Sequence, residues 1–575
     1  MGLLASAALV LAGGWSAHLG MRVRDHLEAA RTALIELRAV ASAEDPRPAA
    51  AALAEARRHA AEARRLTGGP DWWTIAHTPI MGDAATTVRG LAESAATLTD
   101  VLADVQRIAV AFTAIKANSL GDLRKPLADL DAASPALDAA AARLSRVAAD
   151  LAATPARTGL EQLDQARGTA LHEVDQLHGW LDDAATAAVL LPPMLGLDSP
   201  RRYFLAFQTN AEARGTGGLV GAFGILKADR GKVGIGHLSA NSGLSTSSVS
   251  VADHGRDYRA RYGPSATKML SISNLSPHFP YAAATWTGLW EQQDRGRLDG
   301  AIATDPVGLS YLLELIGPVT LPGGETVTSE NVVDLTERVA YARYTDPVAR
   351  KRFLITIAGA VSEALPASLT DPARLLPVLT RMVNERRIQV WSRHETEQRR
   401  LSRIPISGVL PLRSGPFAGL VVNNSAGGKL DYYLRRSLDY ELGPCRGGMR
   451  SSTVRIRLTN DVPHKELPAY VTDRLDSPER RHIAGSNFLW VSLYGGLGAK
   501  MTAARLDGER VSVIRETERS HPVYSAMLEF APRQSRTLEL DFVEFASDEP
   551  PLVPEQPLVR PQHTRITQDG QGCVP

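Results

Sequence analysis

Two short stretches of this sequence hold residues that could do chemistry, and each combines arginine with a carboxylate. The first is "NAEARGTGGLVGAFG", residues 210–224, which places Asn210, Glu212 and Arg214 just before a run of glycines. Backbone amides in a glycine-rich turn, with an arginine beside them, can hold an anion such as a phosphate. The same residues also suit a plain connection between strands. The stretch therefore predicts either an anion site or a tight turn.

The glycines of this stretch do not match the common nucleotide-binding patterns. A dinucleotide fingerprint needs Gly-x-Gly-x-x-Gly between a strand and a helix. Here Val220 stands at the last glycine position, and the residues that follow have a strand pattern. A P-loop needs a lysine after its last glycine, and none stands in that register. We therefore expect a turn between strands that presents Arg214 toward a pocket.

The second stretch is "YARYTDPVARKRFL", residues 341–354, at the start of a predicted helix. The apolar stripe of that helix, projected backward, passes through Arg350 and Asp346. A charged residue on the core face must be paired, extend its charged end to water or border a polar pocket. Since a helix N-terminus beside arginines suits phosphate, Arg350 is predicted to contact an anion and Arg352 to be solvated. The alternative is a buried structural pair of Arg350 with Asp346.

Other residue patterns exclude several classes of function. The sequence contains neither Gly-x-Ser-x-Gly nor His-Glu-x-x-His, which gives little support to a serine or zinc hydrolase. Its cysteines, Cys445 and Cys573, lack metal-ligand spacing; they predict either one disulfide in an exported protein or two unrelated thiols. The 64 Lys and Arg against 63 Asp and Glu argue against nucleic-acid binding.

The elements that position these residues are distributed over a chain of 575 residues, enough for about two or three packed units. The first 20 residues contain an uncharged, mostly apolar run, Leu3 to Leu19. This run predicts a transmembrane signal-anchor over 1–20, with a signal peptide as the alternative. In both cases we expect the bulk of the chain to be extracytoplasmic.

The next region, residues 21–194, is rich in alanine and has helical periodicity. Its clearest apolar seam runs from Val88 to Phe112. Proline and glycine interrupt the pattern several times, which predicts an antiparallel helical bundle that serves as a stalk. Pro192 and Pro193 end the helical pattern, so we expect a domain boundary near residue 195.

Residues 195–445 alternate strand and helix patterns and predict a mixed α/β domain. "DRGK" (229–232) predicts a hairpin turn and "GAIAT" (300–304) a buried strand. Asp305 and Asp346 each precede a proline and predict helix starts. Short alternating strands over 446–548 predict a β-sandwich, and the proline-rich residues 549–575 an extended tail. The fold class is therefore multidomain α and β.

Several stretches together resemble the bacterial domain-of-unknown-function 4012 family. They are "RRYFLAFQTNAEARGTGGLVGAFGILKADRGKV", "NLSPHFPYAAATWTGLWEQQ", "LDGAIATDPVGLSYLLELIGPVTLPGGETVTSENV" and "NNSAGGKLDYYLRRSLDYEL". The resemblance covers about residues 195–445. Members are similar to one another in being predicted envelope proteins with an anchored helical region before this domain. The resemblance therefore implies a single-pass cell-membrane protein, and it implies no particular activity.

More distantly, the order of elements resembles the LytR-CpsA-Psr envelope phosphotransferases. That family attaches polyprenyl-pyrophosphate-linked glycopolymers to the cell wall, using arginines and a magnesium-binding aspartate. "LDGAIATDPVGLSYLLELIGPVTLPGG" is similar to their strand and helix before a glycine turn, and "YARYTDPVARKRFL" to their arginine-rich segment. The implied anion contacts are Arg214, Arg343 and Arg350.

The same resemblance assigns roles to the polar residues beside these arginines. Glu212 or Asp346 would act as acid, base or metal partner, and Mg²⁺ is the ion that the resemblance implies, although the residues alone require no cofactor. Asn210 stands where the family has a metal-binding aspartate, and it is grouped here with the anion contacts. Thr345 stands where a second strand-end arginine would be.

The leading functional hypothesis is a membrane-anchored extracytoplasmic protein that handles a cell-envelope glycopolymer or its polyprenyl-phosphate precursor, as a binding protein or a phosphotransferase. Its expected partners are the envelope glycan or polyprenyl-phosphate lipid and, through the N-terminal helix, the membrane; no nucleic acid is expected. The alternative is a non-catalytic envelope scaffold or adhesion protein. The two hypotheses differ in whether the three arginines converge on one anion site.

Overall fold

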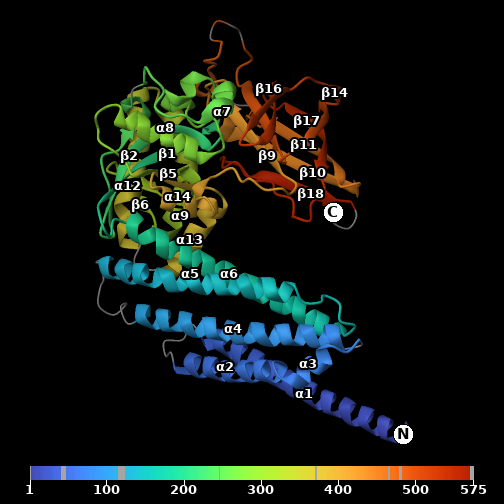
Figure 1. Ribbon diagram of the computed structural model, residues 1–575. Helices are drawn as coiled ribbons and strands as arrows, with labels where there is room; N and C mark the ends of the chain where they lie inside the picture. Colours follow the sequence, from blue (N-terminus) through green and yellow to red (C-terminus); the bar gives the residue numbers. More distant parts are fainter. Residues whose placement is uncertain are drawn as a thin grey trace. The chain divides into compact units, whose positions relative to one another are not determined.

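The protein forms two compact units, Met1–Ser199 and Pro200–Pro575, shown as a ribbon in Figure 1. The description rests on a computed structural model. It covers residues 2–40, 47–79, 81–113, 123–244, 246–368, 372–463, 467–477, 479 and 482–569.

The first unit consists of helices, as the periodicity of residues 21–194 predicts. They are α1 (Gly2–Val40), α2 (Arg47–Thr67), α3 (Pro70–Ala76), α4 (Gly82–Thr113), α5 (Arg124–Ala152) and α6 (Glu161–Met194). Contacts join α1 to α2, α2 to α4, α4 to α5, and α5 to α6. Within the described part of the chain, no helix combines the length and apolar character needed to cross a bilayer.

The buried face of α4 differs from the predicted seam of large apolar side chains. Its most buried residues include the small Ala92, Ala96 and Thr99, whereas Leu98 of the seam is only partly buried. The helix contacts α2 as well as α5 and α6. Small side chains allow neighbouring helices to approach closely, so packing on several sides selects alanine and threonine for the interior.

The second unit begins with a six-stranded sheet in the order β3-β2-β1-β5-β8, with β4 paired to β2. Its strands are β1 (Arg201–Arg214), β2 (Gly217–Asp229), β3 (Lys232–Ile235), β4 (Ser239–Ala240), β5 (Gly300–Thr304) and β8 (Ile388–Ser392). β1 and β5 are parallel, and the other pairs are antiparallel. The sheet is mixed.

Helices and short elements surround this sheet. They are α7 (Gly255–Tyr262), α8 (Phe279–Glu291), α9 (Pro306–Ile316), α10 (Val332–Asp334), α11 (Ala340–Arg343), α12 (Pro347–Ser368), α13 (Pro372–Asn384), α14 (Glu395–Leu401), α15 (Ala469–Thr472) and the short strands β6 (Val319–Thr320) and β7 (Thr326–Val327). Together with the sheet, they make the mixed α/β region that the sequence predicts.

The two faces of the sheet pack against different helices (Figure 1). On one face, Phe204 of β1 contacts Trp286 of α8, with 5.7 Å between ring centroids. Phe207, on the opposite face because side chains alternate along a strand, packs against the core formed by α9 and α12. The sheet is therefore buried on both sides at its centre.

Local sequence signals for turns and helix starts are confirmed. The hairpin between β2 and β3 pairs Asp229 with Lys232 around the predicted turn. The side chain of Asp305 accepts a hydrogen bond from the Gly308 amide at 2.8 Å, which caps α9. Gly317 ends that helix with a φ of 83°. These signals succeed because each depends only on neighbouring residues.

The C-terminal part of the second unit is rich in sheet. One sheet has the order β14-β13-β17-β11-β10-β18 and the other β15-β16-β12-β9, and residues of both contribute to one hydrophobic core. The strands are β9 (Ala418–Asn424), β10 (Leu434–Arg446), β11 (Met449–Asn460), β12 (Asn487–Gly495), β13 (Lys500–Leu506), β14 (Glu509–Arg510), β15 (Ile514–Glu518), β16 (His521–Phe530), β17 (Ser535–Phe545) and β18 (Gln562–Gln568). These strands extend on both sides of the predicted range 446–548.

The buried Trp286 allows a test of the α8 contact with the sheet. Its indole nitrogen donates to Ser273 Oγ at 2.8 Å, and its ring is fully buried. We expect Trp286→Ala to lower the free energy of unfolding of this unit by about 3–5 kcal/mol. Urea unfolding followed by near-ultraviolet circular dichroism measures the change. The control Trp180→Ala, at an exposed position of α6, should change stability by less than about 0.5 kcal/mol; equal effects would contradict the assignment.

Candidate functional site

The end of β1 departs from regular pairing at the first predicted stretch. Its register with β2 shifts between Thr209 and Ala213, as in a β-bulge. Glu337 accepts hydrogen bonds from two amides of the irregular segment, Asn210 at 3.0 Å and Ala211 at 2.8 Å. A carboxylate thus replaces the sheet partner that the shifted backbone lacks.

The glycines after β1 serve close packing of the backbone. A Cβ on Gly215 would lie 2.2 Å from the carbonyl oxygen of Leu275, and one on Gly218 would lie 2.1 Å from that of Thr209. No side chain fits at these distances. The amide of Gly215 donates to Asn423 Oδ1 at 2.9 Å. The geometry therefore supports the tight connection, one of the two interpretations of this stretch.

Glu212 and Arg214 are buried at the end of β1 and pair with each other. Arg214 donates to Glu212 at 2.7 Å, and Lys429 donates to the other carboxylate oxygen. The remaining donors of Arg214 reach the carbonyl oxygens of Ser271, Ala213 and Asn424. All three guanidinium nitrogens of Arg214 therefore donate to groups of the protein itself.

Arg350 has a different environment, although it is equally buried. It is 2% exposed, its guanidinium carbon lies 3.6 Å from the centroid of the Tyr470 ring, and it donates to the carbonyl of Tyr344 at 3.1 Å. Within the described residues no carboxylate lies within ion-pair distance of it, and Asp346 forms no ion pair with it. The predicted structural pair of Arg350 with Asp346 is therefore not formed.

Three other buried arginines of this unit have a carboxylate partner. Arg214 pairs with Glu212 at 2.7 Å, and Arg387 with Asp305 at 2.9 Å. Arg261 pairs with Glu516 and Glu518. Leaving a buried charge without a counter-ion is costly, which makes the environment of Arg350 distinctive.

Tyr470 connects Arg350 to the charges at the end of β1. The ammonium of Lys429 lies 5.6 Å from the centroid of the same ring that covers Arg350. Tyr470 is carried by the short helix α15 and is 42% exposed. We call Glu212, Arg214, Arg350, Lys429 and Tyr470 the Tyr470 cluster. It brings together two of the three predicted arginines.

Arg343, the third arginine, does not join this cluster, so the predicted convergence of all three arginines on one anion site is not formed. It forms two hydrogen bonds to Glu325, at 2.7 and 2.9 Å, and its side chain is partly exposed. Asp346 is exposed and accepts from the amides of Ala349 at 2.8 Å and Val348 at 3.2 Å, which cap α12. These hydrogen bonds hold the pKa of Asp346 below its usual value.

The remaining predicted residues lie away from the Tyr470 cluster or outside the described chain. Asn210 is fully buried and donates through Nδ2 to the carbonyl of Pro557 at 2.9 Å, while its Oδ1 has no partner among the described residues. Cys445 is in disulfide form. Cys573 lies outside the described residues, so the pairing of the two cysteines stays a prediction.

Two buried carboxyl groups that the sequence did not single out hold β1 in place. Burial raises the pKa of Glu337 to about 7, against the opposing effect of its hydrogen bonds from Thr209 and from two backbone amides. Burial also raises the pKa of Asp431, which accepts from the Ala213 amide at 2.8 Å.

The carboxylate of Glu212 is held in its ionised form. Burial alone would raise its pKa, but the charges and hydrogen bonds of Arg214 and Lys429 outweigh burial and lower it. Such a group is a poor proton donor at neutral pH. Among the described residues, no three His, Cys, Asp or Glu side chains are grouped to hold a metal ion, so the donors present do not fit a carboxylate-rich Mg²⁺ site.

Comparison with known proteins gives one family match. Residues 198–341 match the family described as "Protein of unknown function (DUF4012)". The match includes β1, β2 and Arg214 but ends before Arg350. No curated protein matches this chain.

One solved structure, from Legionella pneumophila, is of a protein named for a proposed role in nutrient binding. It shares 8% identity, and the match covers 23% of this chain and 44% of that chain, with a TM-score of 0.16. The chain therefore spans less than half of that protein's length. The likeness is too low to carry an argument about fold or function.

The raised pKa of Glu337 predicts a pH-dependent stability. Because this pKa rises from 4.5 to about 7 on folding, the stabilising contribution is full below pH 4.5 and is lost as the pH rises through 7. We expect the Tm to fall between about pH 5 and pH 8, and the fall to be smaller in Glu337→Gln, which still accepts from the backbone. Thermal unfolding across that range measures it. The control Glu363→Gln, on the surface of α12, should follow the native slope; an unchanged slope in Glu337→Gln would refute the assignment.

Proposed function

We propose that this chain, whose residues 198–341 match the DUF4012 family, is an extracytoplasmic envelope protein that binds a phosphate-bearing glycopolymer or its polyprenyl-phosphate precursor. The binding group in this proposal is the guanidinium of Arg350 in the Tyr470 cluster. One observation carries it: Arg350 is buried, yet none of the described carboxylates lies within ion-pair distance of its guanidinium, and Asp346 acts on it only from farther away.

The energetic argument starts from the cost of burying a charge. A buried guanidinium without a counter-ion is unfavourable by several kcal/mol, and contact with aromatic rings returns about 2 kcal/mol. Arg350 has Tyr470 and Tyr341 rings at 3.6 and 5.6 Å and a single carbonyl acceptor. A phosphate oxygen would supply both the missing charge and the missing acceptors.

Access to Arg350 depends on Tyr470. The Tyr470 ring is partly exposed and covers the guanidinium, and it belongs to a helix of only four residues. In the proposed mechanism, the ring turns aside when the anion arrives, and Lys429, close to the same ring, then faces the ligand as a second cation. The two cations suit a ligand with more than one negative charge, such as a pyrophosphate.

The proposal is for binding, because the predicted catalytic groups are already occupied. Both carboxylate oxygens of Glu212 are bonded to cations, and Asp346 caps a helix. A Mg²⁺ ion would supply charge neutralisation to a transferring phosphate, but the described residues do not form a donor set for it. No transfer step is therefore derived for this chain.

The finer fold assignments belong to the same proposal. We propose that the two C-terminal sheets form a β-sandwich, supported by the single hydrophobic core to which both contribute. The relation of the central region to the LytR-CpsA-Psr transferases is likewise a proposal. It rests on element order and on the segments of Arg214 and Arg350.

The envelope location rests on two observations. The apolar run from Leu3 to Leu19 suits export, with or without cleavage. Cys445 is in disulfide form, and disulfides persist in oxidising compartments outside the cytoplasm. Attachment to the membrane through residues 1–20 is part of the proposal.

A second candidate function is a non-catalytic scaffold or adhesion protein. The observation in its favour is that Arg214, Glu212 and Lys429 fully satisfy one another inside the protein. In that case, the Tyr470 cluster would only hold the C-terminal sheets against β1. The two candidate functions differ in whether Arg350 contributes to anion binding.

Titration of the full chain with farnesyl pyrophosphate, a soluble polyprenyl pyrophosphate, tests the proposal by calorimetry. We expect Arg350→Ala to weaken binding about tenfold to a hundredfold, as loss of a charge-assisted hydrogen bond predicts. Arg350→Lys, which keeps the charge, should lose less. Raised salt should weaken binding of the native chain.

Arg343→Ala is the matched control, because Arg343 lies seven residues away and its guanidinium is occupied by Glu325. It should leave the affinity within about twofold. The Tm of each variant reports whether the fold is intact. If farnesyl pyrophosphate does not bind, or if both Arg350 variants bind as the native chain does, the anion-binding proposal fails and the scaffold candidate remains.

A further inference from the structure

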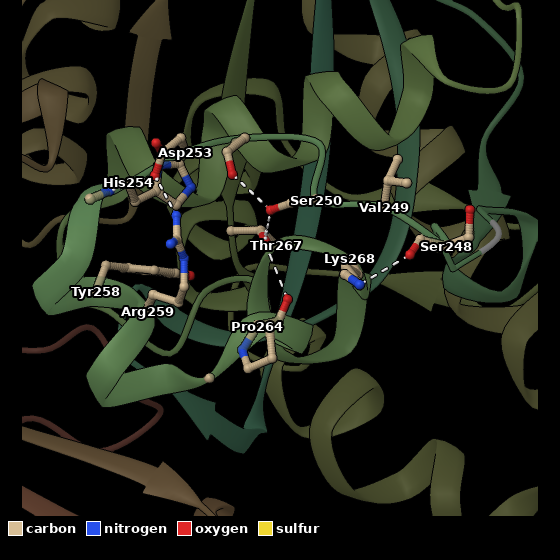
Figure 2. Close-up of a pocket in the computed structure, with 13 residues that line it drawn as sticks. Ser248, Val249, Ser250, Asp253, His254, Tyr258, Arg259, Pro264, Thr267 and Lys268 are labelled. Carbon is tan, nitrogen blue, oxygen red and sulfur yellow. Dashed lines mark hydrogen bonds and ion pairs between the residues drawn. The ribbon is translucent and has the colours of Figure 1, made fainter.

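A cavity of about 370 Å³ lies apart from the Tyr470 cluster, in the segment that includes α7. Thirteen of the residues between Ser248 and Lys268 line it, from the loop before α7 through the turn that follows. Figure 2 shows Tyr258 and Arg259 on one side, Ser248 and Lys268 on the other, and Ser250 and Thr267 between them. Its volume is within the range of small-molecule sites.

One polar group that lines this cavity is buried without a partner. Tyr258 is 2% exposed, and its hydroxyl makes no hydrogen bond within the described chain. In Figure 2, its side chain extends from α7 toward the middle of the lining residues. Burial raises the pKa of the Tyr258 hydroxyl above its usual value, so the hydroxyl stays protonated at neutral pH and can donate a hydrogen bond. An unsatisfied buried donor calls for an acceptor that the protein does not provide.

The cavity also contains a cation without a counter-ion. Lys268 donates to the carbonyl oxygen of Ser248 at 3.0 Å and has no ion-pair partner among the described residues. The other two charged groups of the lining, Asp253 and Arg259, pair with each other at 3.1 Å. The lining therefore has one uncompensated positive charge.

Aromatic and hydroxyl-bearing side chains line the cavity alongside small and apolar residues. Burial lowers the pKa of His254 to about 4, so its ring is neutral at neutral pH, and it lies 4.7 Å from the Tyr258 ring. Ser250 and Thr267 place their hydroxyls beside each other. Aromatic rings pack against the C–H faces of a sugar, and hydroxyl side chains exchange hydrogen bonds with its hydroxyls.

We propose that this cavity binds a monosaccharide that carries an anionic group, a carboxylate or a phosphate. Lys268 binds the anionic group, the hydroxyls of Ser250 and Thr267 bond to sugar hydroxyls, and the Tyr258 hydroxyl donates to a ligand oxygen. The site is separate from Arg350, and this inference stands without the proposed polyprenyl-phosphate binding.

Three probes test the inference with the full chain: glucuronic acid, glucose 6-phosphate and glucose, titrated in ligand-detected nuclear magnetic resonance. We expect at least one anionic sugar to bind more tightly than glucose, and the tighter of the two identifies carboxylate or phosphate as the preferred group. Lys268→Ala should weaken the anionic sugar about tenfold and remove its preference over glucose. Arg256→Ala is the control, because this exposed α7 arginine does not line the cavity.

Tyr258→Phe separates a binding role from a structural one. Because the hydroxyl has no partner within the described protein, its removal should leave the Tm unchanged or higher, while the sugar affinity falls several-fold. The inference is overturned if no probe binds, if glucose binds as tightly as both anionic sugars, or if Lys268→Ala retains the anionic preference. A lower Tm for Tyr258→Phe with native affinity would also overturn the role of the hydroxyl.

Discussion

The carboxylate of Glu212 lies inside the protein between Arg214 and Lys429, and the arrangement at the end of β1 depends on it. Glu212 and Arg214 come from one strand, whereas Lys429 is more than 200 residues away, beside the C-terminal sheets. Removing one member of such a buried group leaves an uncompensated charge, at a cost of about 3–5 kcal/mol. The ion group therefore fixes where the hairpin ends and which segment lies against it. Because Lys429 lies near the ring that covers Arg350, the ion group also fixes where the end of β1 lies relative to Tyr470 and Arg350.

The bulge in β1 lets backbone amides at the end of the strand bond to buried carboxyl groups. A regular strand would bond its amides alternately to the strands on its two sides, but the shifted segment turns the amides of Asn210 and Ala211 to Glu337, and that of Ala213 to Asp431. Both carboxyl groups are buried and have raised pKa values. Since Glu337, with a pKa of about 7, is only partly ionised near neutral pH, the net charge around β1 is more positive than the count of acidic residues indicates.

The sequence predicts well what neighbouring residues decide. The helix start at Asp305, the turn at 229–232 and the absence of a nucleotide-binding glycine loop all follow from spacing within a few residues. The buried face of α4 is less predictable, because its contacts with several other helices select small side chains and not the largest apolar stripe. A periodicity analysis depends on the difference between a buried apolar face and an exposed polar face, and a helix that is buried on several sides lacks that difference.

Prediction of the candidate site fails for long-range partners and succeeds for positions on a helix face. The stripe projected through α12 placed Arg350 on the core side, and it is buried there. Nothing near it in the sequence indicates Tyr470 or Lys429, which come from segments about 80 to 120 residues later, and such contacts arise only from tertiary packing. Arg343 shows the converse, since its type and position suit an anion contact but Glu325 already occupies its guanidinium.

The contrast among the buried arginines bears most directly on function. Arg214, Arg261 and Arg387 each form an ion pair with a carboxylate, which compensates the buried charge of an arginine that has only a structural role. At Arg350, the protein substitutes an aromatic ring from a four-residue helix, which binds a cation less strongly than a carboxylate and moves more easily. In the proposed function, an arriving anion replaces this weaker aromatic contact. Asp346, the exposed residue that caps α12, lies outside ion-pair distance of Arg350, although the charge of Arg350 contributes to lowering its pKa.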